Sequence, residues 1–139
     1  MSKGNTTEND LVAYIFNNTA IPWAAETTLY VALHTADPGE AGTQTTSEAA
    51  YTGYARVAVS RNSSGWTVAG NQASNTSQVQ FPTCTDNLGG TPTATHFSVG
   101  RLASGGGQIF YKGALNSALA ISQNVTPQFA AGALVVTED

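Results

Sequence analysis

The sequence predicts an all-β fold: a two-sheet, jelly-roll-like β-sandwich of about eight strands with one short N-terminal helix. Short segments in which apolar and polar residues alternate recur along the chain, and clusters of Gly, Pro, Asn and Ser separate them. Only one stretch, near the N-terminus, has apolar residues at helical spacing. With 139 residues, the chain is long enough for one domain with a hydrophobic core. We therefore interpret residues 1–139 as a single β-sandwich domain.

The helix is expected over residues 7–18, after an N-terminal arm of residues 1–6. Thr7 can cap the helix, and acidic residues favour its first turn. One face at helical spacing carries Leu11, Tyr14, Ile15 and Asn18. The Asn17-Asn18 pair and Pro22 then end the helix. We expect it to pack across one end of the sheets.

The rest of the chain is predicted to form strands, because its apolar residues alternate with period two and are rich in β-branched and aromatic types. The eight expected strands are residues 29–35, 53–59, 66–69, 77–81, 93–99, 108–112, 117–122 and 133–137. Residues 61–65 are predicted to form the turn of a hairpin, and residues 104–107 a second hairpin turn. Residues 70–77 are polar and are expected to form a surface loop.

Residues 36–52 form a long polar connection between two of these strands. Loops of this length without secondary structure are usually functional or disordered. The segment contains three acidic residues and no basic residue, which suits contact with another protein better than phosphate binding. Asp37-Pro38-Gly39-Glu40 is predicted to be a type II turn. We expect a chain shortened within residues 41–50 to fold but to lose its docking function.

Neutral side chains supply most of the polarity of the sequence. Charged residues make up 10% of the chain, against roughly 25% in a typical soluble domain, while Ser, Thr, Asn and Gln number 47. Such a surface suits a protein that lies permanently against neighbours, and it also suits a neutral extracellular domain. The net charge is −4, and the five basic residues are scattered, so nucleic-acid binding is not expected.

The single Cys84 cannot form an internal disulfide, in keeping with synthesis in a reducing cytoplasm. No apolar run approaches the length of a membrane span, and the N-terminus lacks the features of a signal peptide. We therefore expect no membrane partner and no secretion signal.

The sequence has no motif that predicts catalysis, a cofactor site or a metal site. His34 and His96 are late in predicted strands and could share a sheet face, but no metal-binding spacing accompanies them. No Gly-x-Ser-x-Gly motif is present, and the acidic residues cluster in loops. We expect no catalytic residue, no cofactor, no metal and no small-molecule substrate. An enzyme built on a β-sandwich, using the two histidines, is the least favoured hypothesis.

Four segments resemble a known family: LYVALHTADPGEAGT, YTGYARVAV, THFSVG and PQFAAGALVVTED. They are similar to small virion proteins of tailed bacteriophages that are often labelled tail fibre proteins, and to small β-rich proteins that decorate or cement capsids. The resemblance runs from about Leu11 to Asp139. It implies a virion structural protein, and its motifs reflect strand pattern and turn chemistry.

Two structural functions follow from this resemblance. In the first, the chain is a capsid decoration or cement protein that binds the outside of the shell, with the major capsid protein and copies of itself, as a homodimer or homotrimer, as partners. In the second, it is a tail fibre or tail-associated protein with a structural or receptor-binding role. The residues predicted to contact a partner are Trp23, Asp37, Pro38, Glu40, Thr43, Thr45, Tyr51, Asn71, Asn75 and Phe129.

Overall fold

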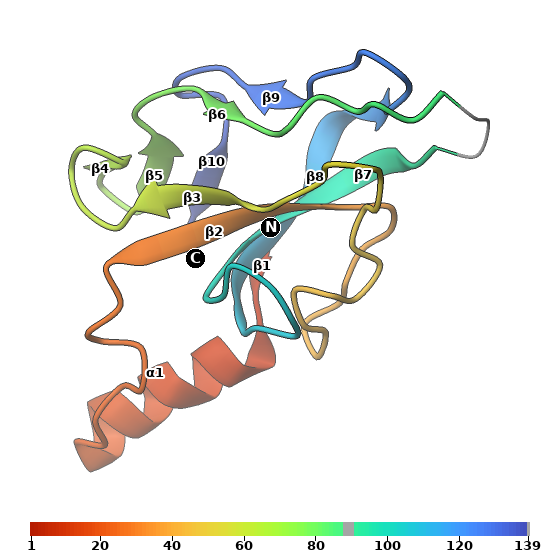
Figure 1. The fold of residues 1–139 in the computed structure, drawn as a ribbon. Coiled ribbons are helices and arrows are strands. Elements are labelled where there is room, and N and C mark those ends of the chain that lie inside the picture. Colours follow the sequence, from red (N-terminus) through yellow and green to blue (C-terminus); the bar gives the residue numbers. More distant parts are fainter. Residues whose placement is uncertain (88–90, 139) are drawn as a thin grey trace.

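A computed structural model describes residues 1–87 and 91–138 of the chain (Figure 1). Its one described helix is α1 (Asn5–Asn17). Its strands are β1 (Ser2–Lys3), β2 (Thr28–His34), β3 (Val57–Ser60), β4 (Trp66–Ala69), β5 (Gln72–Asn75), β6 (Val79–Gln80), β7 (Thr93–Gly100), β8 (Ile109–Ala120), β9 (Gln128–Phe129) and β10 (Val135–Thr137). The predicted class, an all-β fold with a short N-terminal helix, is confirmed.

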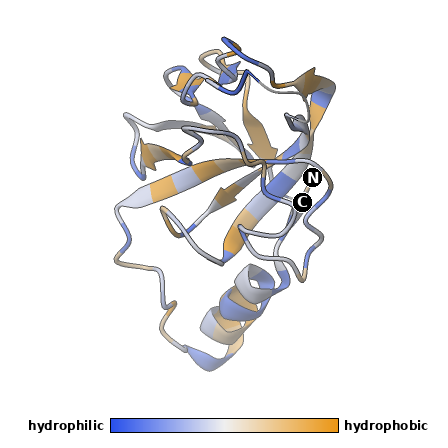
Figure 2. Cartoon of the chain, turned by 45° about the vertical axis from the view of Figure 1, so that its right-hand side comes forward, coloured by the Kyte–Doolittle hydropathy of each residue, from blue (hydrophilic) through white to orange (hydrophobic). Residues whose placement is uncertain are grey.

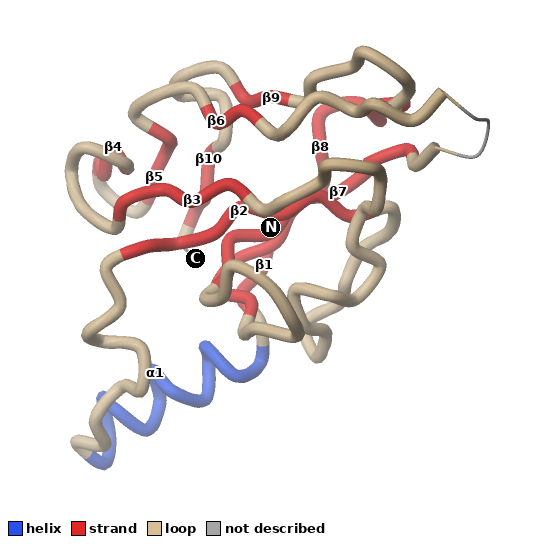
Figure 3. The backbone as a smooth tube through the Cα atoms, viewed as in Figure 1, coloured by secondary structure: helices blue, strands red, loops and turns tan. Residues whose placement is uncertain are grey.

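The strands form three antiparallel sheets. The largest has five strands in the order β1-β8-β7-β2-β3, and the other two have the orders β10-β5-β4 and β6-β9. The two smaller sheets lie together along one side of the five-stranded sheet, and α1 extends away from the opposite side (Figures 1 and 3). The second layer of the sandwich is therefore divided between a three-stranded and a two-stranded sheet.

Most of the predicted strands lie where the alternation placed them, and β2, β4 and β7 match their predicted ranges closely. Two predictions were wrong. Residues 108–112 and 117–122 belong largely to one continuous strand, β8, because Gly113 and Ala114 continue the pairing with β7. Residues 61–65 do not join a hairpin; they carry the chain from β3 in the five-stranded sheet to β4 in the three-stranded sheet.

Three strands were not predicted: β1, β5 and β9. β1 lies in the predicted N-terminal arm and pairs with β8, with Ser2 opposite Lys112, so residues 1–6 are not a free arm. β5 lies in the predicted polar loop and is the central strand of its sheet. These strands are short and largely polar. Main-chain pairing holds them in place, and their sequences lack the apolar alternation from which a strand is predicted.

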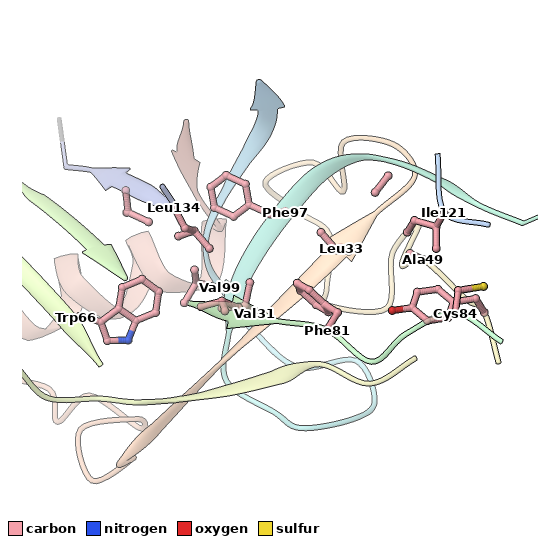
Figure 4. Close-up of a cluster of buried hydrophobic side chains, with 14 residues drawn as sticks. Val31, Leu33, Ala49, Trp66, Phe81, Cys84, Phe97, Val99, Ile121 and Leu134 are labelled. Atoms are coloured by element: carbon pink, nitrogen blue, oxygen red, sulfur yellow. The ribbon is translucent and has the colours of Figure 1, made fainter. Parts of the chain in front are cut away.

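The hydrophobic core lies between the five-stranded sheet and the two smaller sheets. β2 and β7 contribute Val31, Leu33, Phe97 and Val99 from one side, and Phe81 lies opposite them at 1% exposure. Figure 4 shows this cluster as an elongated row with Trp66 at one end and Cys84 at the other. Cys84 is a free, fully buried thiol.

Residues of the long loop cover the other face of the five-stranded sheet. His34 and Ser98 point to this face and are fully buried. Gln44 is also fully buried, and it lies directly against Gly100 and Gly107, where any Cβ would overlap its amide group. Its Oε1 accepts a hydrogen bond from the Leu102 amide at 2.8 Å. The sheet is thus enclosed on this face by the chain's own loop.

The helix begins at Asn5 rather than at Thr7, and Gly4 occupies the N-cap position without a side-chain cap. Thr7 does not cap the helix: it is buried and its hydroxyl donates to the Ile109 carbonyl at 2.8 Å. The helix ends as predicted, because Asn18 adopts a left-handed conformation with φ of 52°. Only the first half of α1 is bonded to the sheet, so the prediction that the helix packs across a sheet end holds for its first turns alone.

Candidate functional site

The loop of residues 36–52, predicted to lie across a partner, is an integral part of the domain. Glu48 is held by Arg56 through two hydrogen bonds, of 2.7 and 2.8 Å. The Arg56 guanidinium also donates to the carbonyls of Leu102 and Gly105, and its side chain is only 2% exposed. The Tyr54 hydroxyl donates to the same carboxylate at 3.0 Å, and burial raises the pKa of Tyr54.

Residues 41–50 therefore contain groups on which folding depends. Gln44 and Ala49 are buried, and Glu48 is the partner of Arg56. The structure changes our expectation for a chain shortened here: we now expect it to lose stability as well as any docking function. The length of the loop reflects its role as a cover for the sheet.

The predicted contact residues of this loop have different surroundings. The carboxylate of Asp37 accepts from the Gly39 amide and pairs with Lys112 at 2.9 Å, so the pKa of Asp37 is held below its ordinary value by Lys112 first and by Gly39 second. Gly39 has φ of 72°, as the predicted type II turn requires. Pro38 is buried, Thr43 is half-buried, and Glu40 and Thr45 are exposed. Asp37 is also exposed, so it, Glu40 and Thr45 are the predicted contacts of this loop that offer side-chain surface.

The three aromatic residues proposed as contacts all pack within the chain. Trp23 lies edge-on against Phe110 at 4.9 Å between ring centroids, and its indole N–H donates to Asp10. Tyr51 is buried, donates its hydroxyl to the Pro82 carbonyl, and has a pKa raised to about 12 by burial. Phe129 packs against the core. The rings of these three residues are therefore used, wholly or in part, in contacts within the chain.

Asn71 and Asn75, although only four residues apart, occupy different environments. Asn71 is exposed and its amide donates to the Glu138 carbonyl. Asn75 is 1% exposed; it donates to the carbonyls of Ser77 and Ala130 and accepts from the Leu134 amide. Its side chain is wholly engaged inside the chain and is not available to a partner.

The two histidines share a sheet face, as predicted, because His34 and His96 are directly opposite each other in the β2–β7 pairing. His34 Nδ1 donates to the Thr46 carbonyl, so Nε2 is the acceptor and receives the Ser98 hydroxyl at 2.8 Å. Both ring nitrogens of the neutral side chain are thereby used. Burial lowers the pKa of His34 below its ordinary value.

The buried His34 predicts a loss of stability in mild acid. The unfolded chain binds a proton near pH 6.5, whereas the folded chain, with its lowered pKa, resists it. The free energy of unfolding should therefore decrease as the pH falls through 6.5, by at most about 1.4 kcal/mol per pH unit. Urea unfolding between pH 7.5 and 5.5 measures this slope. A His34→Gln variant should have a clearly flatter profile, and an equal slope in both proteins would contradict the assignment.

All five basic side chains lie in the described ranges, and each is engaged within the chain. Four form ion pairs with acids: Lys3 with Glu138, Arg56 with Glu48, Arg101 with Glu26, and Lys112 with Asp37. The fifth, Arg61, lies over the Trp23 ring and donates from Nη1 to three carbonyls of the segment that follows α1.

Across residues 1–87 and 91–138, no three His, Cys, Asp or Glu side chains come together in a group that could hold a metal ion. Over the same ranges, no helix has the length and apolar character needed to span a membrane.

An exposed apolar surface lies on the second half of α1, among residues that were not predicted to contact a partner. Val12, Ile15 and Phe16 are 57%, 68% and 79% exposed. They have the i, i+3, i+4 spacing of one helix face. Figure 2 shows the apolar bands of α1 on a helix that stands off from the sheets. The sequence carries a signal for this surface: residues 11–16 are continuously apolar, and a surface helix can bury only one stripe of them.

A second apolar feature is an open pocket of about 530 Å³ between the five-stranded and three-stranded sheets. Its apolar lining comprises Leu29, Trp66, Val68, Val99, Tyr111 and Val136, and Arg61 supplies its one charged side chain. The Trp66 indole N–H is buried without an acceptor among the described residues. Together with the 72% exposure of Val68, this indicates that the core is incompletely closed at this end.

The profile of one protein family matches residues 2–137. That family is Gp80, described as Podophage GP4 fiber I protein gp80. The chain belongs to this family. No curated protein matches the sequence. Membership confirms the resemblance to small tailed-phage virion proteins often labelled tail fibre, and it supports a structural role in the virion.

Proposed function

We propose that this protein is a non-enzymatic structural component of a phage fibre and that it acts by binding other virion proteins. The observation that carries the proposal is the apolar face of α1. Three large apolar side chains stand in solvent on a helix whose first half is firmly bonded to the sheet. Exposing this face is unfavourable for an isolated protein, and contact with a partner would bury it.

The chemistry of the polar groups supports a binding role over catalysis. The ring nitrogens of His34 are both bonded inside the domain. The basic side chains are likewise bonded within the chain, which disfavours nucleic acid as the partner. What remains at the surface is apolar, neutral polar and, in part, acidic, without a free basic side chain among the described residues.

The family description favours a fibre over the capsid shell. The alternative is a decoration or cement protein on the outer capsid, with the major capsid protein as its partner. One observation favours it: the sequence has no heptads and no repeats from which to build a fibre shaft. As a fibre component, the chain would therefore be a module carried by other subunits or assembled from several copies.

Imaging of intact particles tests the proposal. Particles labelled with gold-conjugated Fab fragments raised against this protein should carry gold on fibres at the tail. Labelling over the whole shell, at a copy number comparable with that of the major capsid protein, would support the decoration alternative and contradict the fibre assignment. Purified particles without the protein would contradict both.

A further inference from the structure

We propose that copies of this chain associate head to tail, with the apolar face of α1 of one copy occupying the pocket between the five-stranded and three-stranded sheets of the next. This inference rests on the proposed structural function and names a partner for the same surface. It is argued from two open apolar features of the described residues: the helix face and the pocket lined by Trp66 and Val68.

The helix has the form of a ligand for an apolar groove. Val12, Ile15 and Phe16 project from consecutive turns, in the anchor spacing of helices that bind in grooves. The first half of α1 is fixed by hydrogen bonds from Gln108 to Thr7 and Asp10. Because the helix is already formed and anchored, docking would not require folding of the segment, which lowers its entropic cost.

The pocket has the size and lining for such anchors. Its volume of about 530 Å³ lies within the range of roughly 300–1,000 Å³ typical of ligand pockets. Val68 on β4 is exposed at one wall, and Trp66 beside it leaves a donor unpaired. An apolar side chain entering from a neighbour would bury Val68 and complete the packing around Trp66.

Charge also favours a second copy as the occupant. The helix carries an exposed acid, Glu8, and no basic residue in its last turn. The charged residue of the pocket is Arg61, whose bonds to the chain all use Nη1, which leaves other N–H donors for a carboxylate. The helix and the pocket are different surfaces, so their contact is heterologous and extends into a ring or a filament.

Self-association of the isolated protein provides the test. The wild-type chain is compared with Phe16→Asp, which alters the helix, and Val68→Asp, which alters the pocket. Leu102→Asp is the matched control, because Leu102 is a 44% exposed apolar residue outside both surfaces. Sedimentation velocity over a range of concentrations measures association, and far-UV circular dichroism verifies that each variant is folded.

The wild type and the control should increase in mass with concentration. Each of the two surface variants should associate at least about tenfold more weakly, because a charge would enter an apolar contact. Mixing Phe16→Asp with Val68→Asp should restore association, and only as far as dimers, since one intact helix meets one intact pocket. During this titration the indole N–H resonance of Trp66, which lines the pocket, should shift in an ¹⁵N–¹H spectrum.

Three outcomes would overturn the inference. The first is a wild-type chain that remains monomeric at high concentration. The second is docking of the helix into the pocket of its own chain, which would not depend on protein concentration. Loss of association in Phe16→Asp but not in Val68→Asp would indicate helix–helix pairing instead. None of these results bears on whether the protein is found on the fibre, so the inference can fail without the proposed function failing.

Discussion

Replacing Arg56 with glutamine should destabilise the domain by about 3–5 kcal/mol, the range expected when a buried ion pair loses one partner. The guanidinium donates to the Glu48 carboxylate from two nitrogens and also donates to two main-chain carbonyls. The Arg56 side chain is nearly inaccessible to solvent. The variant leaves the half-buried charge of Glu48 without its cationic partner, removes the Arg56 donor from the Gly105 carbonyl, and leaves the Leu102 carbonyl with the Gln44 amide alone. The midpoint of urea unfolding at pH 7.5 measures the loss.

Arg101→Gln is the matched control for this prediction. Arg101 pairs with Glu26 at 2.9 Å, but both side chains are about one-third exposed. Solvent screens such a pair, so its loss should cost less than about 1 kcal/mol. If the Arg56 variant were no less stable than the Arg101 variant, the loop of residues 36–52 would not be the structural cover described above.

The second large effect is expected for Asn75→Ala, at about 3 kcal/mol or more. This side chain joins β5 to the segment before β10 by donating to the Ser77 and Ala130 carbonyls and accepting from the Leu134 amide. Alanine would leave the Ser77 carbonyl and the Leu134 amide without these partners, and the Ala130 carbonyl with the Ala133 amide alone, in a site that is 1% exposed at Asn75. Urea unfolding again measures the change.

Asn71→Ala provides the comparison, since this exposed residue makes one side-chain bond to the main chain. Its effect should remain within about 0.5 kcal/mol. Similar stabilities of the two variants would show that Asn75 does not hold the three-stranded sheet to the rest of the domain.

The fold class and most strands could be predicted because the core-facing residues alternate. Val31 and Leu33 are an example: both face the core, while Ala32 and His34 face the loop. β5 and β9 could not be predicted in this way, because they are too short to show an apolar alternation and their order comes from main-chain pairing with distant segments. The division of the second layer depends on the same long-range pairings.

The candidate surface was harder to predict than the fold. Composition and turn signals identified the long loop correctly, but they could not show that Gln44 would fill the space left by Gly100 and Gly107. That fit depends on residues about 60 positions apart meeting in the fold. The apolar run of α1 was visible in the sequence, and only the tertiary structure showed which of its side chains lack a partner.

The most direct test of a structural role exerted through α1 is incorporation into particles. Phage lacking this gene product would be grown with the protein supplied as wild type, as the folded Ile15→Asp/Phe16→Asp variant, or as Leu102→Asp. Quantitative mass spectrometry of purified particles would then measure its copy number. We expect wild-type copy number for the Leu102 control and at least a tenfold lower number for the helix variant, in line with about 1.4 kcal/mol or more of lost contact energy. A helix variant that is incorporated at the wild-type copy number would contradict the account.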